Sequence, residues 1–354
     1  MAWIEAQTAH GQVALDPSIG NIRRLDLHWG GRVIAPLHTA PWVEAPVPDS
    51  VPPVEARLAG DFFCAPFGAA DLDGAPPHGA PANTSWTPIG RNGATLRFRL
   101  DRPVMGARIT KTLRLSDDAP LLYQTHRIDG GDGRLPVAHH PMIHLADGGT
   151  LSVSPKRIAL SPPTPLEPGR NRLALDRRVK DITRFPAARG GVVDLRDLPI
   201  GTRHEDFVTL VETPGAALGW TAVLRAAEDD IVFVLKSPAI LPVTMLWHSN
   251  GGRDYAPWNA RHRGVLGIED GCAAGAAGHA AALAPNPVAA EGVATALRLG
   301  GSIRIPHVIG AVPRPQGWKT IAAITAAAGQ LTLQEAGGGT LSLPFDTAFL
   351  DGTR

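Results

Sequence analysis

The even spread of glycine and proline through this chain limits its fold more than any other feature. The 354 residues include 39 glycines and 33 prolines, and the segments between them are short. Some alternate apolar and polar residues, as Thr95 to Leu100 and Ala107 to Leu115 do, and Ile231 to Leu235 is apolar throughout. Period-two alternation bounded by turn-forming residues is typical of β-strands. We therefore predict an all-β fold, a large antiparallel β-sandwich with many short strands.

The end of the chain predicts a hairpin from Gln330 to Leu343, with two leucines on each arm and three glycines between the arms. Helical periodicity is scarce. The alanine-rich windows 273–284 and 321–328 are the candidates for helices, although Gly275 and Gly278 interrupt the first. Strand-like patterning resumes on both sides of the proline-rich tract 36–53, so it is not a domain linker. We predict one domain, 1–354, with residues 311–354 as a candidate edge addition.

Charge and cysteine content exclude several classes of partner. The chain has 34 basic and 33 acidic residues, which is too even a balance to attract nucleic acid or an anionic membrane surface. The two cysteines, Cys64 and Cys272, form no CxxC pair, so neither a zinc site nor a disulfide framework is indicated. The first residues lack the pattern of a signal peptide, and no long uncharged apolar run is present. We predict a cytoplasmic protein.

Three short motifs carry the groups that acid–base chemistry needs. His78 lies in a Pro-Pro-His-Gly sequence, His140 in His-His-Pro-Met, and Glu269 in Gly-Ile-Glu-Asp-Gly. Two imidazoles and a carboxylate can move a proton on and off a sugar oxygen near neutral pH. Successive strand residues face opposite ways, so only one of His139 and His140 can point into a cleft. Asp270, which follows Glu269 and precedes glycine, is expected to be a turn residue.

In this order and spacing, the motifs resemble those of the galactose mutarotase-like proteins, which include the aldose 1-epimerases. The first motif of the resemblance is the glycine-bounded stretch 60–68, and the resemblance as a whole extends over roughly residues 20 to 310. It implies a β-supersandwich that interconverts sugar anomers without a metal or an organic cofactor. It further implies that His140 protonates the ring oxygen, that Glu269 removes the anomeric proton, and that His78 binds the ring oxygen or a neighbouring hydroxyl.

The same resemblance suggests residues that hold the sugar. Asp206 is similar to an acidic residue that grips sugar hydroxyls, although Glu205 could serve as well. Relatives acting on hexose phosphates have an arginine where this chain has Asn83, so a neutral or uronic sugar is favoured over a phosphorylated one, and Asn83 is a candidate contact.

Aromatic residues and one arginine add to this predicted sugar site. Trp247 and Trp258 bracket a glycine-rich loop, and an indole face can pack under a pyranose ring. Arg253, in that loop, can reach a hydroxyl or a carboxylate.

Two other functions remain open. One is a carbohydrate-binding protein on the same fold without catalysis, which would lack a histidine and a carboxylate on opposite sides of one pocket. The other is a metal-dependent sugar isomerase, because His144 follows His140 by four residues and a nearby carboxylate could complete a metal site. In each case the partner is a small-molecule sugar, and the protein is expected to be a monomer or a homodimer.

Overall fold

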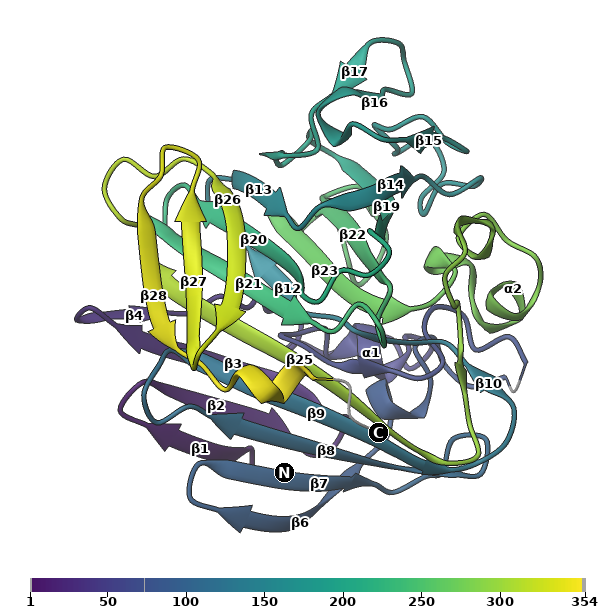
Figure 1. The fold of residues 1–354 in the computed structure, drawn as a ribbon. Helices are drawn as coiled ribbons and strands as arrows, with labels where there is room; N and C mark the ends of the chain where they lie inside the picture. The colour runs from purple at the N-terminus through teal and green to yellow at the C-terminus, as the bar shows by residue number, and fades with distance from the viewer. Residues whose placement is uncertain (1, 73, 352–354) are drawn as a thin grey trace.

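Antiparallel sheets make up most of the regular secondary structure in a computed structural model that describes residues 2–72 and 74–351 (Figure 1). Strands hold 47% of the chain and helices 7%. The prediction of an all-β antiparallel sandwich is therefore confirmed. Within the described residues, every helix is too short or too polar to cross a membrane.

A nine-stranded sheet forms one layer of the sandwich, in the order β18-β13-β20-β21-β25-β9-β8-β7-β6. Its strands are β6 (Trp86–Asn92), β7 (Thr95–Leu100), β8 (Ala107–Leu115), β9 (Leu121–Gly130), β13 (Gly149–Val153), β18 (Asp197–Leu198), β20 (Gly219–Arg225), β21 (Asp230–Lys236) and β25 (Ser302–Pro313). The two alternating runs seen in the sequence are β7 and β8.

An eight-stranded sheet forms the other layer, in the order β15-β14-β19-β22-β23-β11-β5, with β12 also paired to β23. Its strands are β5 (Phe63–Cys64), β11 (Val137–His139), β12 (Met142–His144), β14 (Lys156–Leu160), β15 (Arg178–Val179), β19 (His204–Glu212), β22 (Val243–Asn250) and β23 (Val265–Cys272). This sheet carries the candidate site.

Smaller elements surround the two layers. They are a four-stranded sheet of β1 (Ile4–Thr8), β2 (Gly11–Asp16), β3 (Asn21–Trp29) and β4 (Arg32–Ile34), a three-stranded sheet of β26 (Ile321–Ala327), β27 (Gln330–Glu335) and β28 (Thr340–Pro344), and the pairs β10 (Arg134–Leu135) with β24 (Leu297–Arg298) and β16 (Phe185–Pro186) with β17 (Val192–Val193). The helices are α1 (Pro53–Ala56) and α2 (His279–Leu283), together with the 3-10 turns Ala80–Ala82, Ile182–Arg184, Gly275–Ala277, Ala289–Glu291 and Thr347–Leu350.

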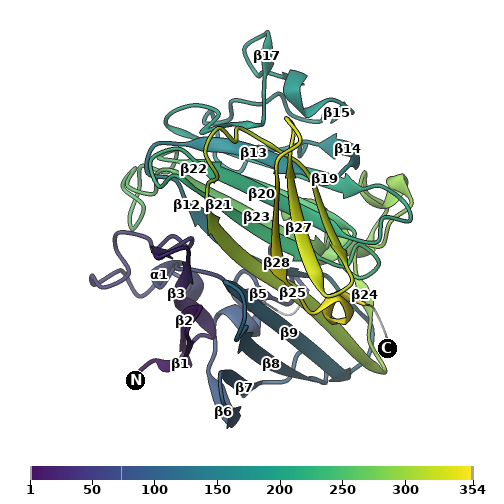
Figure 2. The ribbon, with the colours of Figure 1, turned by 60° about the vertical axis from the view of Figure 1, so that its left-hand side comes forward.

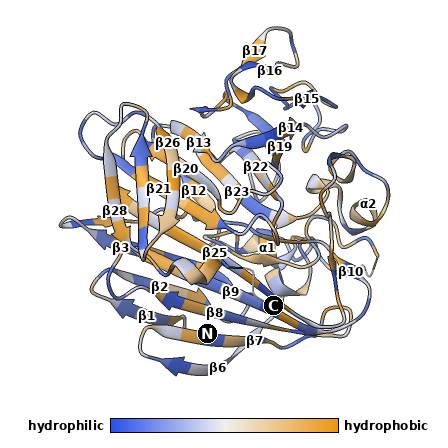
Figure 3. Cartoon of the chain, in the orientation of Figure 1, coloured by the Kyte–Doolittle hydropathy of each residue, from blue (hydrophilic) through white to orange (hydrophobic). Residues whose placement is uncertain are grey.

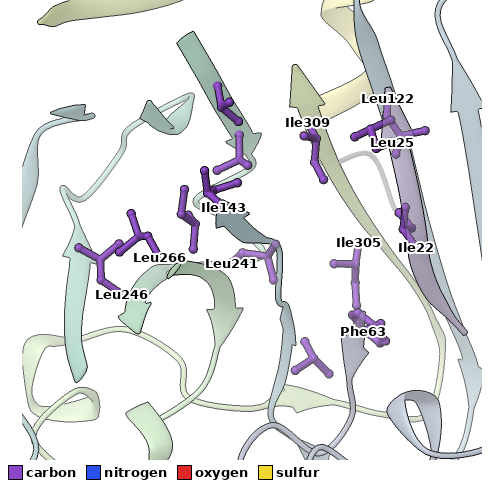
Figure 4. Packing of buried hydrophobic residues seen from close by; sticks show 14 of the residues in the cluster. Ile22, Leu25, Phe63, Leu122, Ile143, Leu241, Leu246, Leu266, Ile305 and Ile309 are labelled. Atoms are coloured by element: carbon purple, nitrogen blue, oxygen red, sulfur yellow. The ribbon is translucent and has the colours of Figure 1, made fainter. Parts of the chain in front are cut away.

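The largest hydrophobic cluster joins the two large sheets. Figure 4 shows part of it, including Leu246 and Leu266 from the eight-stranded sheet and Ile305 and Ile309 from the nine-stranded sheet. All four side chains are fully buried. Burial of apolar surface on this scale is the main driving force for joining the two layers.

Strand β21 explains why one run of the sequence is apolar on both faces. Val232 and Val234 belong to the cluster between the two large sheets, whereas Ile231, Phe233 and Leu235 belong to a separate cluster on the outer face of the nine-stranded sheet. Alternate residues of a strand point to opposite faces, so a strand covered on both sides is apolar throughout.

The C-terminal three-stranded sheet covers that outer face (Figure 2). Its buried leucines, Leu331, Leu333 and Leu343, pack in one cluster with Trp220 and Phe233. The residues of β27 and β28 alternate between polar and apolar, as expected for strands with one buried face, and Figure 3 colours the chain by this hydropathy.

The predicted hairpin in this region is confirmed, because β27 pairs with β28 in the register Leu331 to Leu343 and Leu333 to Leu341.

The prediction of a helix at 321–328 was wrong, because Ile321–Ala327 form strand β26. Ile321 and Ile324 are both buried and are three residues apart, which imitates helical spacing. A register shift between Ile321 and Ala323 causes this, since a bulge changes which residues face the core. In the other candidate, 273–284, only the five residues of α2 are α-helical, and Gly275 and Gly278 both have positive φ angles.

A second cluster covers the face of the eight-stranded sheet that points away from the nine-stranded sheet. Met245 and Trp247 of β22 lie in this cluster, while Leu246 between them faces the inter-sheet core. The covering residues include Trp42 and Phe62, from the irregular chain that leads from β4 to β5. This covered outer face is where the candidate active site lies.

Buried histidines are expected to make the fold sensitive to acid. Burial, assisted by a neighbouring histidine, lowers the pKa of both His38 and His248 to about 4. The unfolded chain therefore takes up protons first, near the ordinary histidine pKa. We expect the free energy of unfolding to be unaffected by these groups above that pKa, and to fall as the pH drops from about 6.5 towards 4, by about 1.4 kcal/mol per pH unit for each histidine.

Urea unfolding at about pH 7.5 and about pH 5 would measure this loss. A His248→Gln variant should show a shallower dependence on pH than the wild type, because it removes one of the titrating groups. An unfolding midpoint that does not change between the two pH values would contradict the expectation.

Candidate active site

Strand pairing places His140 directly beside Glu269. The pairs Ala138 to Gly271 and Met142 to Gly267 are in one register across β11, β12 and β23, so His140 lies opposite Glu269. Residues opposite each other on neighbouring antiparallel strands are in side-chain contact. The His140 Nε2 and Glu269 Oε1 atoms are 3.0 Å apart, and both side chains are buried. The two groups are therefore neighbours on one wall and do not stand on opposite sides of a pocket, which was the arrangement named above to distinguish an enzyme from a binding protein.

Backbone hydrogen bonds and a ring contact fix the position of His140. Its backbone N–H donates to Asp61 Oδ1 at 2.9 Å, and the next residue, Pro141, has no N–H to offer. The Pro141 carbonyl accepts from the Ile268 N–H at 2.9 Å, which holds the two strands together at this point. The imidazole stacks on the Phe62 ring with centroids 4.4 Å apart. Neither Asp61 nor Phe62 was predicted as part of the site.

His139 faces the opposite side of the sheet, as the alternation of strand residues requires. Its ring stacks on His307, with centroids 4.3 Å apart, in the layer between the two large sheets. Among the described residues, the group that could hold a metal ion is Asp61, His139 and His307. Its two imidazole planes lie 13° apart, so their in-plane lone pairs do not converge on one ion, and these residues fit a metal poorly.

The pair proposed for a metal, His140 and His144, is not brought together with a carboxylate. His140 contacts Glu269, whereas His144 Nδ1 lies 3.4 Å from His38 Nδ1.

His78 reaches the cavity from a tight loop in which both His78 and Gly79 have positive φ angles, 66° and 71°. A Cβ atom on Gly79 would lie 2.1 Å from the Ala65 carbonyl oxygen, so only glycine fits there. The His78 Nδ1 atom accepts from the Gly68 N–H at 3.4 Å, which leaves the proton on Nε2. Burial, with nearby His140 and Arg253, lowers the pKa of His78 to about 3. His78 is thus a neutral hydrogen-bond donor near pH 7.

Asn83 does not line the cavity, so the expectation that it contacts substrate was wrong. Its amide nitrogen donates to the carbonyls of Pro77 and Gly79, both at 2.8 Å, and its amide oxygen accepts from the Val54 N–H at 3.0 Å. Asn83 therefore fastens the loop of His78 to helix α1.

Trp247 and Trp258, the two tryptophans predicted to contact a sugar, form the aromatic wall of the cavity. A Cβ atom on Gly267 would lie 3.0 Å from Glu269 Oε1 and 3.1 Å from the Trp247 Cβ, so this glycine leaves room for both side chains. The Arg253 guanidinium lies over both indoles, 4.3 Å from the Trp258 ring and 5.6 Å from the Trp247 ring.

Glu205 holds Trp247 in place through hydrogen bonds. Its carboxylate accepts from Trp247 Nε1 and from Ser249 Oγ, each at 2.9 Å, and from the Gly252 N–H at 3.3 Å. Burial raises the pKa of Glu205, although nearby Arg253 and these hydrogen bonds oppose the rise.

Asp206 points the other way because it follows Glu205 on β19, so its predicted contact with sugar hydroxyls was wrong. Its carboxylate accepts from the backbone N–H groups of Arg172 and Leu173 and contacts His204 Nδ1 at 2.8 Å. These partners anchor the loop 161–173 to the sheet.

Asp270 is buried inside β23, which continues to Cys272, so its assignment to a turn was also wrong. It faces the layer between the sheets, opposite to Glu269. Its carboxylate contacts Thr244 Oγ1 at 2.6 Å, Lys236 Nζ at 3.1 Å and His307 Nε2 at 3.0 Å.

The cavity beside the His140–Glu269 pair has a volume of about 270 Å³. Of the predicted site residues, the cavity brings together His78, His140, Trp247, Arg253, Trp258 and Glu269, alongside Glu55, Phe62, Phe67 and Phe207.

The apolar walls hold polar atoms without a partner. Four lining side chains have a buried polar atom that forms no hydrogen bond within the described chain: His140 Nδ1, Arg253 Nε, Trp258 Nε1 and Glu269 Oε2. Buried polar groups are nearly always paired, so this cavity suits a small ligand with both apolar and hydrogen-bonding surface.

Solved structures share this fold at low sequence identity. A protein from Escherichia coli K12 described as a putative aldose 1-epimerase is 14% identical, with a TM-score of 0.58 over 88% of this chain and 99% of that one. A galactose mutarotase-like protein from Lactobacillus casei ATCC 334 is 12% identical, with a TM-score of 0.56 over 88% and 100%. No family model and no curated protein sequence matches the chain. The fold is that of the galactose mutarotase-like proteins.

Proposed function

We propose that the protein is an aldose 1-epimerase-like enzyme that interconverts sugar anomers. The observation that carries this proposal is the 3.0 Å contact between His140 and Glu269 on the wall of an indole-lined cavity. The ring oxygen and the anomeric oxygen of a cyclic sugar are bonded to the same carbon. A neighbouring acid and base can therefore reach both oxygens at once, and the two groups need not stand on opposite sides of the sugar.

The proposed reaction consists of two proton transfers in each direction. Glu269 takes the proton of the anomeric hydroxyl while His140 gives its proton to the ring oxygen and the bond from that oxygen to the anomeric carbon breaks. Rotation about the bond between the first two carbons presents the other face of the aldehyde. Closure then returns a proton from the former ring oxygen to His140 and one from Glu269 to the anomeric oxygen.

The remaining residues hold the sugar in this scheme. The neutral His78 ring donates a hydrogen bond to a sugar oxygen, and an indole face of Trp247 or Trp258 packs against the C–H groups of the pyranose. Phe62 fixes the plane of His140 through their stacking contact.

Anomer exchange tests the proposal directly. We expect the protein to speed up the interconversion of anomers of at least one freshly dissolved aldose in a broad panel, measured by polarimetry or NMR exchange. A protein that binds a sugar but accelerates no exchange would favour the alternative, a carbohydrate-binding protein on the same fold.

Metal removal separates the proposal from the metal-dependent isomerase. Prolonged dialysis against EDTA is expected to leave the rate of anomer exchange unchanged, because His140 and Glu269 perform both proton transfers. Loss of activity with rescue by one divalent cation would instead support the isomerase.

A further inference from the structure

We propose that Arg253 forms a carboxylate-binding subsite in the cavity, so that the preferred substrates are uronic acids, aldoses with a carboxylate in place of the terminal hydroxymethyl group. The inference rests on the proposed function and specifies its substrate class. It starts from the place of Arg253, in the loop between β22 and β23, where the side chain lines the same cavity as His140 and Glu269.

The guanidinium of Arg253 is held but not hydrogen-bonded. It lies against the faces of Trp258 and Trp247, which fixes the plane of its N–H groups. Within residues 2–72 and 74–351, no side-chain hydrogen bond or ion pair involves Arg253, and its Nε atom is buried without a partner. Arg253 is partly buried, and a buried N–H donor such as its Nε is costly to leave unpaired unless a ligand satisfies it.

The carboxylate of Glu205 interacts electrostatically with Arg253 but does not accept a hydrogen bond from its guanidinium. Its oxygens already accept from Trp247, Ser249 and Gly252, and no contact within 4.0 Å joins it to Arg253. Glu205 therefore offsets part of the charge from a distance and supports the indole. The N–H groups of the guanidinium remain available on the cavity side.

A carboxylate satisfies this arrangement better than a hydroxyl does. The guanidinium presents parallel N–H groups that match both oxygens of a carboxylate, and the pair also neutralises the charge. A hydroxyl oxygen can accept from one of these groups and brings no charge. Glu55 also lines the cavity. It is partly exposed, as Arg253 is, and within the described chain it forms no ion pair with Arg253, so it leaves the guanidinium available.

The experiment compares sugars that differ only at the terminal carbon. The rate of anomer exchange and the dissociation constant are measured by NMR for D-glucuronate against D-glucose and for D-galacturonate against D-galactose. The wild type is expected to bind and convert the uronate of a pair at least tenfold better. The variant Arg253→Gln should lose roughly 10- to 100-fold on the uronate and much less on the neutral sugar. Arg253→Lys, which keeps the charge without the paired N–H groups, should fall between them.

The matched control is Arg263→Gln, which removes an exposed arginine from the same loop, away from the cavity. Its preference for the uronate should equal that of the wild type, and thermal unfolding of every variant checks that it is folded. If Arg253→Gln is unfolded, the wild-type preference and the Arg253→Lys comparison still decide the question.

Three results would overturn the subsite: equal use of the neutral sugar, an equal loss on both sugars in Arg253→Gln, or stronger binding of hexose 6-phosphates than of uronates. Each leaves anomer exchange itself standing. If no sugar is converted, the proposed function fails, and the binding constants alone decide: Arg253-dependent binding of the uronate supports the subsite, and equal binding of the two sugars rejects it.

Discussion

Replacing Glu269 with glutamine is expected to slow anomer exchange by a factor on the order of 10²–10⁴, the usual contribution of general acid–base catalysis. The amide keeps the size of the side chain and can still hydrogen-bond to His140 across the strand pair, but it cannot take the anomeric proton. The dissociation constant of the sugar should change little, because the loss falls on the transition state more than on the bound substrate. NMR exchange for the rate and a binding titration for the affinity separate the two effects.

The matched control for this variant is Glu55→Gln, which removes another carboxylate from the lining of the same cavity without touching His140. Its exchange rate should stay within about tenfold of the wild type, because Glu55 takes no part in the proton transfers. If Glu269→Gln converts a sugar as fast as the wild type does, Glu269 is not the base and the assignment of the pair fails.

Period-two patterning made the layers of the fold predictable. Strand β21 is apolar on both faces because one face meets the eight-stranded sheet and the other meets the C-terminal sheet, and the sequence shows this as an unbroken run. Strand β26 was not predictable in the same way. Its bulge moves two isoleucines onto one face at a spacing typical of a helix, and the bulge depends on pairing with β27 rather than on local sequence.

Short motifs identified side chains of the cavity but not which face of a strand each side chain occupies. Glu205 and Asp206 are adjacent, and the phase of β19 decides that Glu205 supports Trp247 while Asp206 anchors a loop. The sequence does not show which face of β19 each residue occupies. The assignment follows only once Phe207 is known to line the cavity, because Glu205, two residues earlier, must then lie on the same face. Asn83 holds backbone groups that are distant in sequence, which no local pattern reveals.

Asp270 illustrates a larger limit of sequence patterning. An acid before glycine at the end of an apolar run is usually a turn residue, yet here it belongs to a buried ionic network. Lys236 contacts both Asp270 and Glu212, and Lys156 also contacts Glu212. The partners come from strands far apart in the sequence, so the burial of each charge depends on the assembled sandwich. This network lies on the inter-sheet face of β23, the strand that also carries Glu269 on its other face.

Removal of the Asp270 carboxylate is therefore expected to be strongly destabilising. Burial alone would raise the pKa of this carboxyl, but Lys236, His307 and Thr244 outweigh that effect and hold the pKa below its usual range, so the group is charged at neutral pH. Asp270→Ala leaves Lys236 buried with less compensation, which costs about 3–5 kcal/mol. Urea unfolding measures the loss. A second variant, Asp270→Ala with Lys236→Met, should recover part of it, because the uncompensated charge is then gone.

An ion pair near the surface provides the control for the Asp270 variant. Asp194 contacts Arg196 at 2.7 Å near the surface, and Asp194→Ala should cost less than about 1 kcal/mol. The carboxylate of Asp270 differs from that of Asp194 in burial rather than in the length of its contacts, so the contrast isolates the effect of burying charge. Because the native pKa of Asp270 is lowered, its contribution to stability should persist above the ordinary aspartate pKa of about 3.9 and disappear as the pH falls below it. If Asp270→Ala unfolds at the same urea concentration as the wild type at neutral pH, the ionic network does not stabilise the sandwich in the way these contacts require.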